Sequence, residues 1–158
     1  MKLAKIIKLI ISILICQLAG VIGSIVTVPA VDSWYIDLKK PFFTPPSWVF
    51  APVWTILYLL MGIALYLIWS KVTANREFKE AIKMFSVQLV LNVSWSVVFF
   101  GSKSPLLGML VIIVLWVAIA LTIKKFNKIS KLAGSLLIPY ILWVSYAILL
   151  NLSIWWLN

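Results

Sequence analysis

The chain has 158 residues, of which 64% are hydrophobic and 11% charged, and its mean hydropathy is +1.12. These values exclude a soluble globular domain and indicate an integral membrane protein, whose first partner is the lipid bilayer. A net charge of +10 would favour nucleic acid binding in a soluble chain. Here the basic residues separate long apolar stretches, so we interpret the charge as a mark of membrane topology and expect no nucleic acid partner.

Five windows without charged residues, 9–31, 41–70, 84–102, 104–123 and 132–158, follow one another along the chain. A hydrocarbon core ~30 Å thick requires about 20 apolar residues in a helix, so each window predicts one spanning helix. The predicted helices cover about 6–28, 48–70, 81–100, 105–124 and 133–155, with a loop at 29–47. The predicted fold class is an all-α membrane protein, a five-transmembrane-helix bundle forming a single domain over 1–158.

Lys and Arg residues alternate between the two sides of this bundle. Eleven lie in the N-terminal segment and in the regions 71–83 and 124–131, and three lie in the other loops. The positive-inside rule then predicts a cytoplasmic N-terminus, with the C-terminus and loop 29–47 outside. The first apolar run is longer than that of a signal peptide and no A-x-A site follows, so we expect a retained helix. Without a transit peptide, a bacterial cytoplasmic membrane fits this pattern.

The sequence has no histidine and a single cysteine, Cys16. Serine–histidine hydrolysis, zinc sites and histidine-ligated haem iron are therefore excluded. The predicted helices carry no Asp, Glu, Lys or Arg at depth, which argues against an ion pump or a proton-coupled carrier. We expect no cofactor and no metal, and the residue pattern contains no acid–base or nucleophile–base pair.

Segment 34–58 has an unusual composition, since it holds four of the seven prolines and three of the nine tryptophans. Proline fixes φ and removes a backbone donor, so we predict a stiff connection with little helix before the second spanning helix. Rigid aromatic rings beside it suit a large, flat, apolar ligand. The binding site is therefore predicted to lie under this loop.

Three predicted helices place polar and aromatic side chains on one face at helical spacing. Polar groups in a bilayer need partners, so these faces are expected to point inward. Interhelical hydrogen bonding would also explain the amides. A position that only needed filling could carry leucine, so the presence of tryptophan on these faces favours a ligand pocket. The stripes comprise Trp54 and Tyr58, then Asn92, Trp95 and Phe99, then Tyr140, Trp143 and Ala147. The first predicted helix offers a fourth inward face with Gln17, Gly20 and Ser24. Four tryptophans near helix ends are interpreted as interfacial anchors: Trp48, Trp69, Trp155 and Trp156.

The loop and the stripes together resemble the TspO/MBR family, the translocator proteins that are also called peripheral benzodiazepine receptors in animals. The resemblance covers nearly the whole chain. The motifs that carry it are Trp34-Tyr35, Lys40-Pro41, Pro45-Pro46-x-Trp48, Pro52-Val53-Trp54-Thr55-x-Leu57-Tyr58-x-x-Met61-Gly62, Gln88-Leu89-x-Leu91-Asn92-x-x-Trp95-Ser96, Phe99-Phe100-Gly101, Pro139-Tyr140-x-x-Trp143, Ala147 and Leu150-Asn151.

The resemblance implies a five-helix bundle, often a homodimer, that binds porphyrins and related apolar ligands in a cavity covered by the loop between the first two helices. It implies that Trp54 and Trp143 face the ligand. Together with the stripes, it gives a predicted ligand-binding set of Trp34, Tyr35, Pro45, Trp54, Tyr58, Asn92, Trp95, Phe99, Trp143 and Ala147.

Two positions depart from the family pattern. The animal sterol-recognition segment requires a tyrosine and a basic residue, where this chain has Leu152 and Trp156, so a cholesterol role is poorly supported. An acidic residue that many members carry early in the fourth helix is Ile112 here.

Three functions are compatible with these observations. The favoured one is a membrane receptor or sensor for porphyrins, in which tryptophans stack on the tetrapyrrole and Asn92 donates a hydrogen bond. Lys39 and Lys40 would attract the propionates, although headgroup contacts explain them equally well. The second is an enzyme-like, light- and oxygen-dependent degradation of porphyrin that uses Trp54 and Trp143. The third is transport of tetrapyrroles or lipids, for which the sequence offers no driving force.

Overall fold

A computed structural model describes residues 2–71 and 75–158. Within them the chain is helical, and five stretches are long and apolar enough to cross a membrane. The prediction of an all-α, five-helix membrane bundle is therefore confirmed. The elements are α1 (Lys2–Val31), α2 (Trp34–Asp37), η1 (Ser47–Val49), α3 (Phe50–Ser70), α4 (Arg76–Ser96), η2 (Val97–Gly101), α5 (Pro105–Ile129), α6 (Lys131–Ser135) and α7 (Ile138–Leu157).

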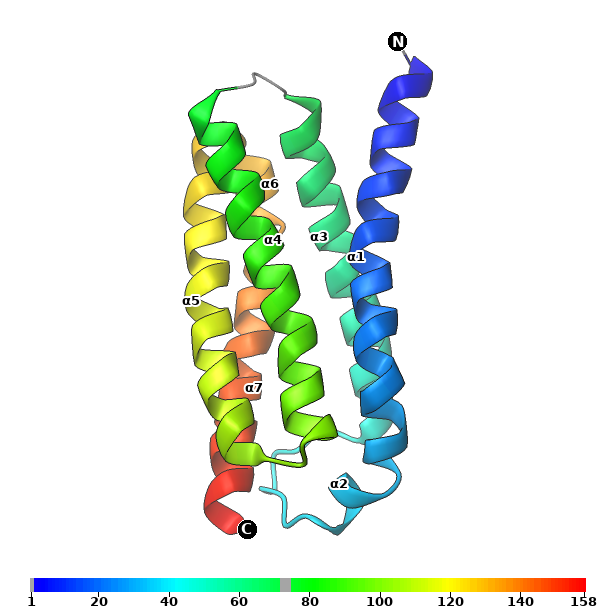
Figure 1. The fold of residues 1–158 in the computed structure, drawn as a ribbon, viewed down its shortest axis with the longest axis vertical. Coiled ribbons are helices and arrows are strands. Elements are labelled where there is room, and N and C mark those ends of the chain that lie inside the picture. The colour runs from blue at the N-terminus through cyan, green and yellow to red at the C-terminus, as the bar shows by residue number, and fades with distance from the viewer. Residues whose placement is uncertain (1, 72–74) are drawn as a thin grey trace.

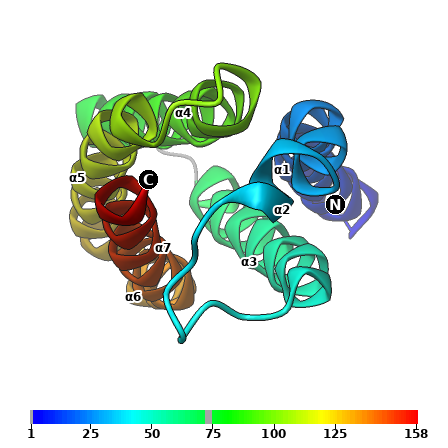
Figure 2. The same cartoon turned by 90° about the horizontal axis from the view of Figure 1, so that it is seen from below.

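The helices form a ring in which α1 packs against α3 and α4, and α5 packs against α4 and α7. Figure 2 shows this ring end-on, with the loop between α1 and α3 crossing one end of it. We call residues 32–49 the lid, and the end of the bundle that they cover the lid end. The N-terminus lies at the opposite end (Figure 1).

Helix α1 is longer than the sequence predicts, because it begins at Lys2 and continues to Val31 instead of ending near 28. Pro29 lies in its last turn, where it removes the N–H that would donate to the Ile25 carbonyl, and the helix ends two residues later. The Ser33 hydroxyl donates to the Pro29 carbonyl at 2.7 Å, so this helix end is satisfied. The lid that follows contains two short helical pieces, α2 and η1, and otherwise lacks regular structure, as its prolines dictate.

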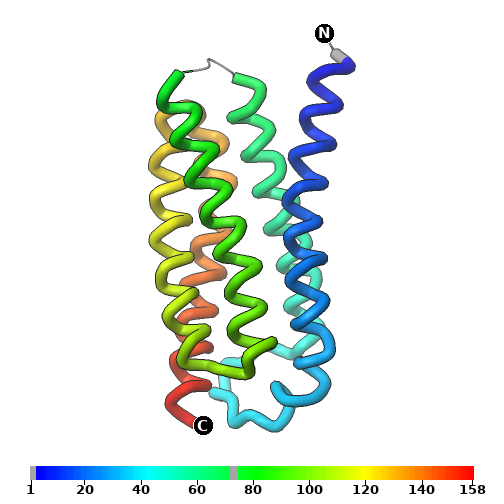
Figure 3. The backbone as a smooth tube through the Cα atoms, viewed as in Figure 1, coloured from blue at the N-terminus to red at the C-terminus, as the bar shows by residue number. Residues whose placement is uncertain are grey.

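The helix that starts as α4 does not end in an ordinary turn. Its last five described residues form the π-helical η2, in which the Ser102 N–H donates to the Val97 carbonyl at 3.0 Å. The wide turn places two consecutive aromatic rings, Phe99 and Phe100, in buried positions. Such π-turns are frequent at functional sites. The tube in Figure 3 shows α4 and η2 as one rod that ends at the lid end.

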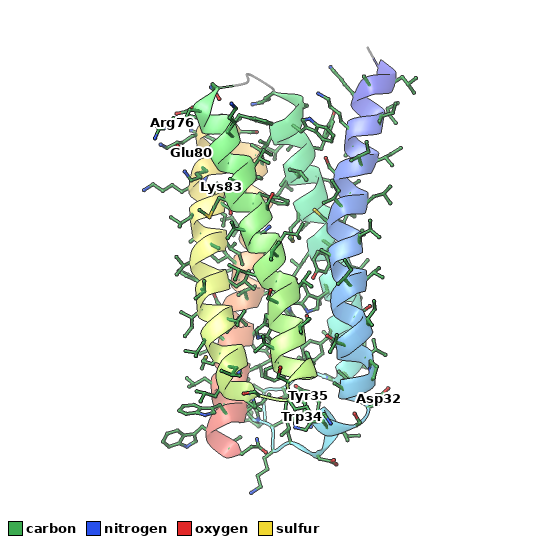
Figure 4. The ribbon with its side chains drawn as sticks, viewed as in Figure 1. Asp32, Trp34, Tyr35, Arg76, Glu80 and Lys83 are labelled. Atoms are coloured by element: carbon green, nitrogen blue, oxygen red, sulfur yellow. The ribbon has the colours of Figure 1, made fainter. Side chains whose placement is uncertain are left out.

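Helix α5 extends to Ile129, beyond the predicted end at 124. The prediction ended with the charge-free window, but the last turns continue past it and form an ion pair with α4. Lys125 Nζ lies 2.8 Å from a Glu80 carboxylate oxygen of α4, and Arg76 lies 2.9 Å from the other oxygen. Figure 4 shows Arg76, Glu80 and Lys83 at the end of the bundle opposite Trp34 and Tyr35. The ion pairs of Glu80 with Arg76 and Lys125 thus lie at the end of the bundle away from the lid.

The contact between α1 and α3 depends on a glycine. A Cβ atom added at Gly62 would lie 2.7 Å from the Ile13 Cα atom and 3.1 Å from its backbone nitrogen. The obstructing atoms belong to the backbone, so the two helices would have to separate. Small residues allow this close approach in membrane bundles.

We therefore expect Gly62→Ala to lower the free energy of unfolding by about 1–3 kcal/mol, since overpacking displaces the backbone. Thermal unfolding in detergent should report a lower Tm. Gly23→Ala is the matched control, because its Cβ would meet the Ser96 hydroxyl at 3.1 Å and a side chain can rotate away. Equal Tm values for the two variants would contradict the tight α1–α3 contact.

Candidate ligand cavity

A cavity of about 530 Å³ opens inside the bundle at the lid end, between α1, α3, α4–η2 and α7. Its volume falls within the range of pockets that hold small-molecule ligands. Seven of the ten residues in the predicted ligand-binding set line it: Tyr35, Trp54, Tyr58, Trp95, Phe99, Trp143 and Ala147. The fold therefore gathers residues from α2, α3, α4, η2 and α7 around one space.

Aromatic rings form the side of the cavity opposite α1. Trp54 stacks on Tyr58 with ring centroids 5.5 Å apart and planes inclined by 30°. Trp95 stacks on Phe99 at 5.3 Å and 23°. The ring of Trp143 packs edge-on against Phe50 at 6.0 Å. Offset stacks of this kind hold large rings in fixed orientations and present flat apolar faces to the enclosed space.

Three of the four tryptophans that line the cavity, Trp54, Trp95 and Trp143, differ in what their indole N–H groups do. Trp95 Nε1 donates to Asn151 Oδ1 at 3.3 Å, and Asn151 Nδ2 donates in turn to the Pro105 carbonyl at 2.7 Å. Within the described chain, the indole nitrogens of Trp54 and Trp143 have no such partner. These two donors are therefore available to a ligand.

Asn92 was predicted to contact the ligand, but it lies behind the cavity wall. It is 2% exposed, does not line the cavity, and bridges two tyrosines. The Tyr58 hydroxyl donates to Asn92 Oδ1, and Asn92 Nδ2 donates to the Tyr140 hydroxyl at 2.9 Å. The amide is thus engaged behind the cavity floor, where it joins α3, α4 and α7.

Two further residues of the predicted set lie beside the cavity and do not line it. Trp34 is half-buried in the lid and packs edge-on against Phe99 at 5.7 Å. Pro45 lines a separate hollow on the flank of the bundle. Tyr35 does reach the cavity, and its ring contacts Phe100 at 5.8 Å. Burial, followed by the proximity of Tyr146, raises the pKa of Tyr35 to about 12.

Helix α1 contributes a strip of small and hydroxyl side chains opposite the aromatic rings. The strip follows helical spacing and consists of Gln17, Gly20, Gly23, Ser24 and Thr27. Gly20 is needed at its place, since a Cβ there would lie 2.6 Å from Tyr58 Cε2. The sequence had indicated Gln17, Gly20 and Ser24 as an inward face. Gly23 and Thr27 could have been found by extending that spacing by one turn.

Residues at the start of α3 and in η1 also reach the cavity, and sequence reasoning missed them. Trp48, interpreted as an interfacial anchor, lines the cavity although it is 74% exposed. Phe50 and Ala51 follow it. Nothing in their spacing identifies them, because their placement depends on how the lid returns to α3.

The sequence led us to expect the basic residues Lys39 and Lys40 at the cavity, but the charged residue found there is acidic. Asp32 is the charged residue that lines it within the described chain, and neither Lys39 nor Lys40 does. Lys40 Nζ donates to the carbonyls of Ile36 and Leu38 at 3.0 and 3.1 Å and lies 4.8 Å from the Tyr35 ring centroid. Its ammonium group therefore stabilises the fold of the lid.

The lid is fastened to α7 at two places. Asn158 accepts a hydrogen bond from the Lys39 N–H and donates one to the Lys39 carbonyl, both at 3.0 Å. The Tyr146 hydroxyl donates to the Phe43 carbonyl at 2.6 Å. Both contacts join residues more than 100 positions apart, so they hold the lid over the cavity.

Comparison with known proteins gives an independent result. The TspO/MBR family profile matches residues 12–157. The chain is 45% identical to a "Tryptophan-rich protein TspO" of Archaeoglobus fulgidus over 154 residues, which cover 98% of this chain and 99% of the relative. A "Tryptophan-rich sensory protein" of Cereibacter sphaeroides is 36% identical over 80% of this chain and 78% of its own. A "Translocator protein" of Bos taurus is 32% identical over a stretch that covers 90% of this chain and 85% of the relative.

We expect Asn92→Leu to lower the free energy of unfolding by about 1–3 kcal/mol, because two buried tyrosine hydroxyls lose their partner. Thermal unfolding in detergent measures this. Ser94→Ala is the control on the same helix, since the Ser94 hydroxyl donates only to the Val90 carbonyl of its own helix. Unchanged stability in Asn92→Leu would show that the bridge contributes nothing.

We expect Asn158→Ala to loosen the lid, because both hydrogen bonds to Lys39 are lost at about 0.5–1.5 kcal/mol each. Amide hydrogen exchange should become faster for residues 38–46 and remain unchanged in the middle of α5. Ser153→Ala is the control, since its hydroxyl donates to the Leu149 carbonyl of its own helix. Equal lid exchange in both variants would contradict the fastening described above.

Proposed function

The chain belongs to the TspO/MBR family, and from this membership and the aromatic cavity we propose that it is a membrane sensor or receptor for porphyrins and related flat, apolar ligands. The names of two relatives, a sensory protein and a translocator protein, support the sensor or receptor role. The five apolar helices make the chain a multi-pass integral membrane protein.

The observation that carries the proposal is the two pairs of stacked rings, Trp54 on Tyr58 and Trp95 on Phe99, around a space of about 530 Å³. A tetrapyrrole is a flat aromatic disc, and it would gain apolar contact from the Trp54 face and from the Trp143 ring. The unpaired indole N–H groups of these two residues would offer it hydrogen bonds.

The carboxylates of a porphyrin constrain its orientation in the cavity. Burying an ionised carboxylate without a partner is costly, and the described lining contains no basic side chain to compensate. The propionates would therefore point toward water at the lid end, where Lys39 is exposed. The tetrapyrrole ring would lie deeper, on the floor formed by Tyr58.

We expect Trp54→Ala to weaken protoporphyrin binding roughly ten-fold, the scale of a central aromatic contact at an interface. A titration in detergent in the dark, following porphyrin absorbance and fluorescence, gives the Kd. Trp156→Ala is the control, because Trp156 is 79% exposed and lies outside the cavity. Equal losses in both variants would contradict the assignment of the cavity.

Illumination of the same samples distinguishes binding from degradation. Bleaching of more than one porphyrin equivalent per protein, abolished in Trp54→Phe/Trp143→Phe, would favour the enzyme-like alternative. Saturable binding without such turnover is what the proposed receptor predicts.

A further inference from the structure

A second hollow lies on the outer flank of the bundle, between α3 and α7 and beneath the lid, with a volume of about 620 Å³. We call it the flank groove. Val53 and Leu57 of α3 form one side of it, and Leu142, Trp143 and Tyr146 of α7 form the other. Its lining is apolar apart from the Tyr146 hydroxyl, which is already bonded to the lid.

The flank groove and the ligand cavity share a wall. Trp143 lines both spaces, so at this position a single side chain separates the interior of the bundle from its outer surface. A change in the orientation of this one ring would join the two spaces.

The Trp143 ring is held only by packing. It packs edge-on against the Phe50 ring at 6.0 Å and at a tilt of 46° against the Tyr146 ring at 5.6 Å, and within the described chain its N–H has no partner. Trp95 and Trp116, by contrast, donate to Asn151 and Ser145 at 3.3 and 2.8 Å. Trp143 can therefore turn without breaking a hydrogen bond, a cost that Trp95 and Trp116 would have to meet.

The spacing of α3 and α7, the helix that carries Trp143, leaves room for this turn. Helix α3 packs against α6, whereas its backbone approaches that of α7 less closely in the described chain. Figure 2 shows α3 and α7 as neighbours in the ring, with the lid passing across the end of the gap between them. Side chains, Trp143 foremost, close this gap.

The flank groove faces the hydrocarbon of the membrane. Phe50 begins α3, so Val53 and Leu57 lie about 5 and 10 Å below its lid end. Leu142 is 63% exposed on the same flank. A flat apolar molecule partitions into the bilayer, and it would meet this groove there, whereas the route from water is covered by the fastened lid.

We propose that the flank groove is a membrane-facing subsite through which a flat aromatic ligand dissolved in the bilayer enters the cavity, with Trp143 as the gate. This inference rests on the proposed function, since the ligand is the one assigned to the cavity. It adds a route and a second site of contact, both on the lipid side of the bundle.

The test fills the groove and leaves the cavity unchanged. The variant Val53→Phe/Leu142→Phe adds bulk on both sides of the groove, and neither residue lines the cavity. The control Ile56→Phe/Leu149→Phe adds the same rings to the same helices at exposed positions outside both hollows. Each protein is reconstituted in phosphatidylcholine vesicles, protoporphyrin is added in the dark, and tryptophan quenching is followed with time and at equilibrium.

We expect the groove-filling variant to bind roughly ten-fold more slowly than the control, as gated association implies. Its Kd should stay near the wild-type value, because one barrier slows entry and exit alike. A wild-type rate in this variant, or a loss of its equilibrium affinity, would overturn the route while leaving the cavity assignment intact. Absence of saturable binding by the wild-type protein would instead refute the proposed function.

Discussion

The hydrogen-bonded bridge from Tyr58 through Asn92 to Tyr140 is the interaction on which the rest of the structure depends. It joins α3, α4 and α7 in the interior of the bundle, where each of the buried hydroxyl and amide groups has another member of the bridge as its partner. The bridge also sets the floor of the cavity, because Tyr58 is the ring on which Trp54 stacks. Asn92, which the sequence predicted to be a ligand contact, thus supports the site from behind.

Above this floor, the cavity exists because two opposite walls are built from side chains of different size. Helix α1 presents glycines and hydroxyls, and α3, α4, η2 and α7 present large rings. The Tyr58 ring packs directly on α1 at Gly20, whereas Trp95 is held in place by its stack on Phe99 and its hydrogen bond to Asn151. The lid then closes the end through Asn158 and Tyr146. Size, stacking and fastening together keep the space open within a tightly packed bundle.

Several features of the site could be predicted from sequence because they follow helical spacing. The inward faces that contain Trp54 and Tyr58, or Trp143 and Ala147, repeat every three or four residues, and a bilayer leaves polar groups no other place to point. Trp48 and Pro45 could not be placed in this way. They belong to the lid, whose path is decided by contacts with α7 more than 100 residues away. The short α2 was unforeseen for the same reason, and the sequence pattern also gave no sign of the π-turn η2 at the end of α4.

The sequence by itself determined the membrane setting, the five helices and the family, because apolar window lengths, charge positions and ordered aromatic motifs are local properties. Only the tertiary structure decided which side chains of each inward face reach the cavity and which support it from behind. Asn92 and Trp95 lie on the same stripe of α4, yet one is buried in a bridge and the other lines the cavity. That difference arises from what α3 and α7 place opposite each residue, and a one-dimensional pattern does not record it.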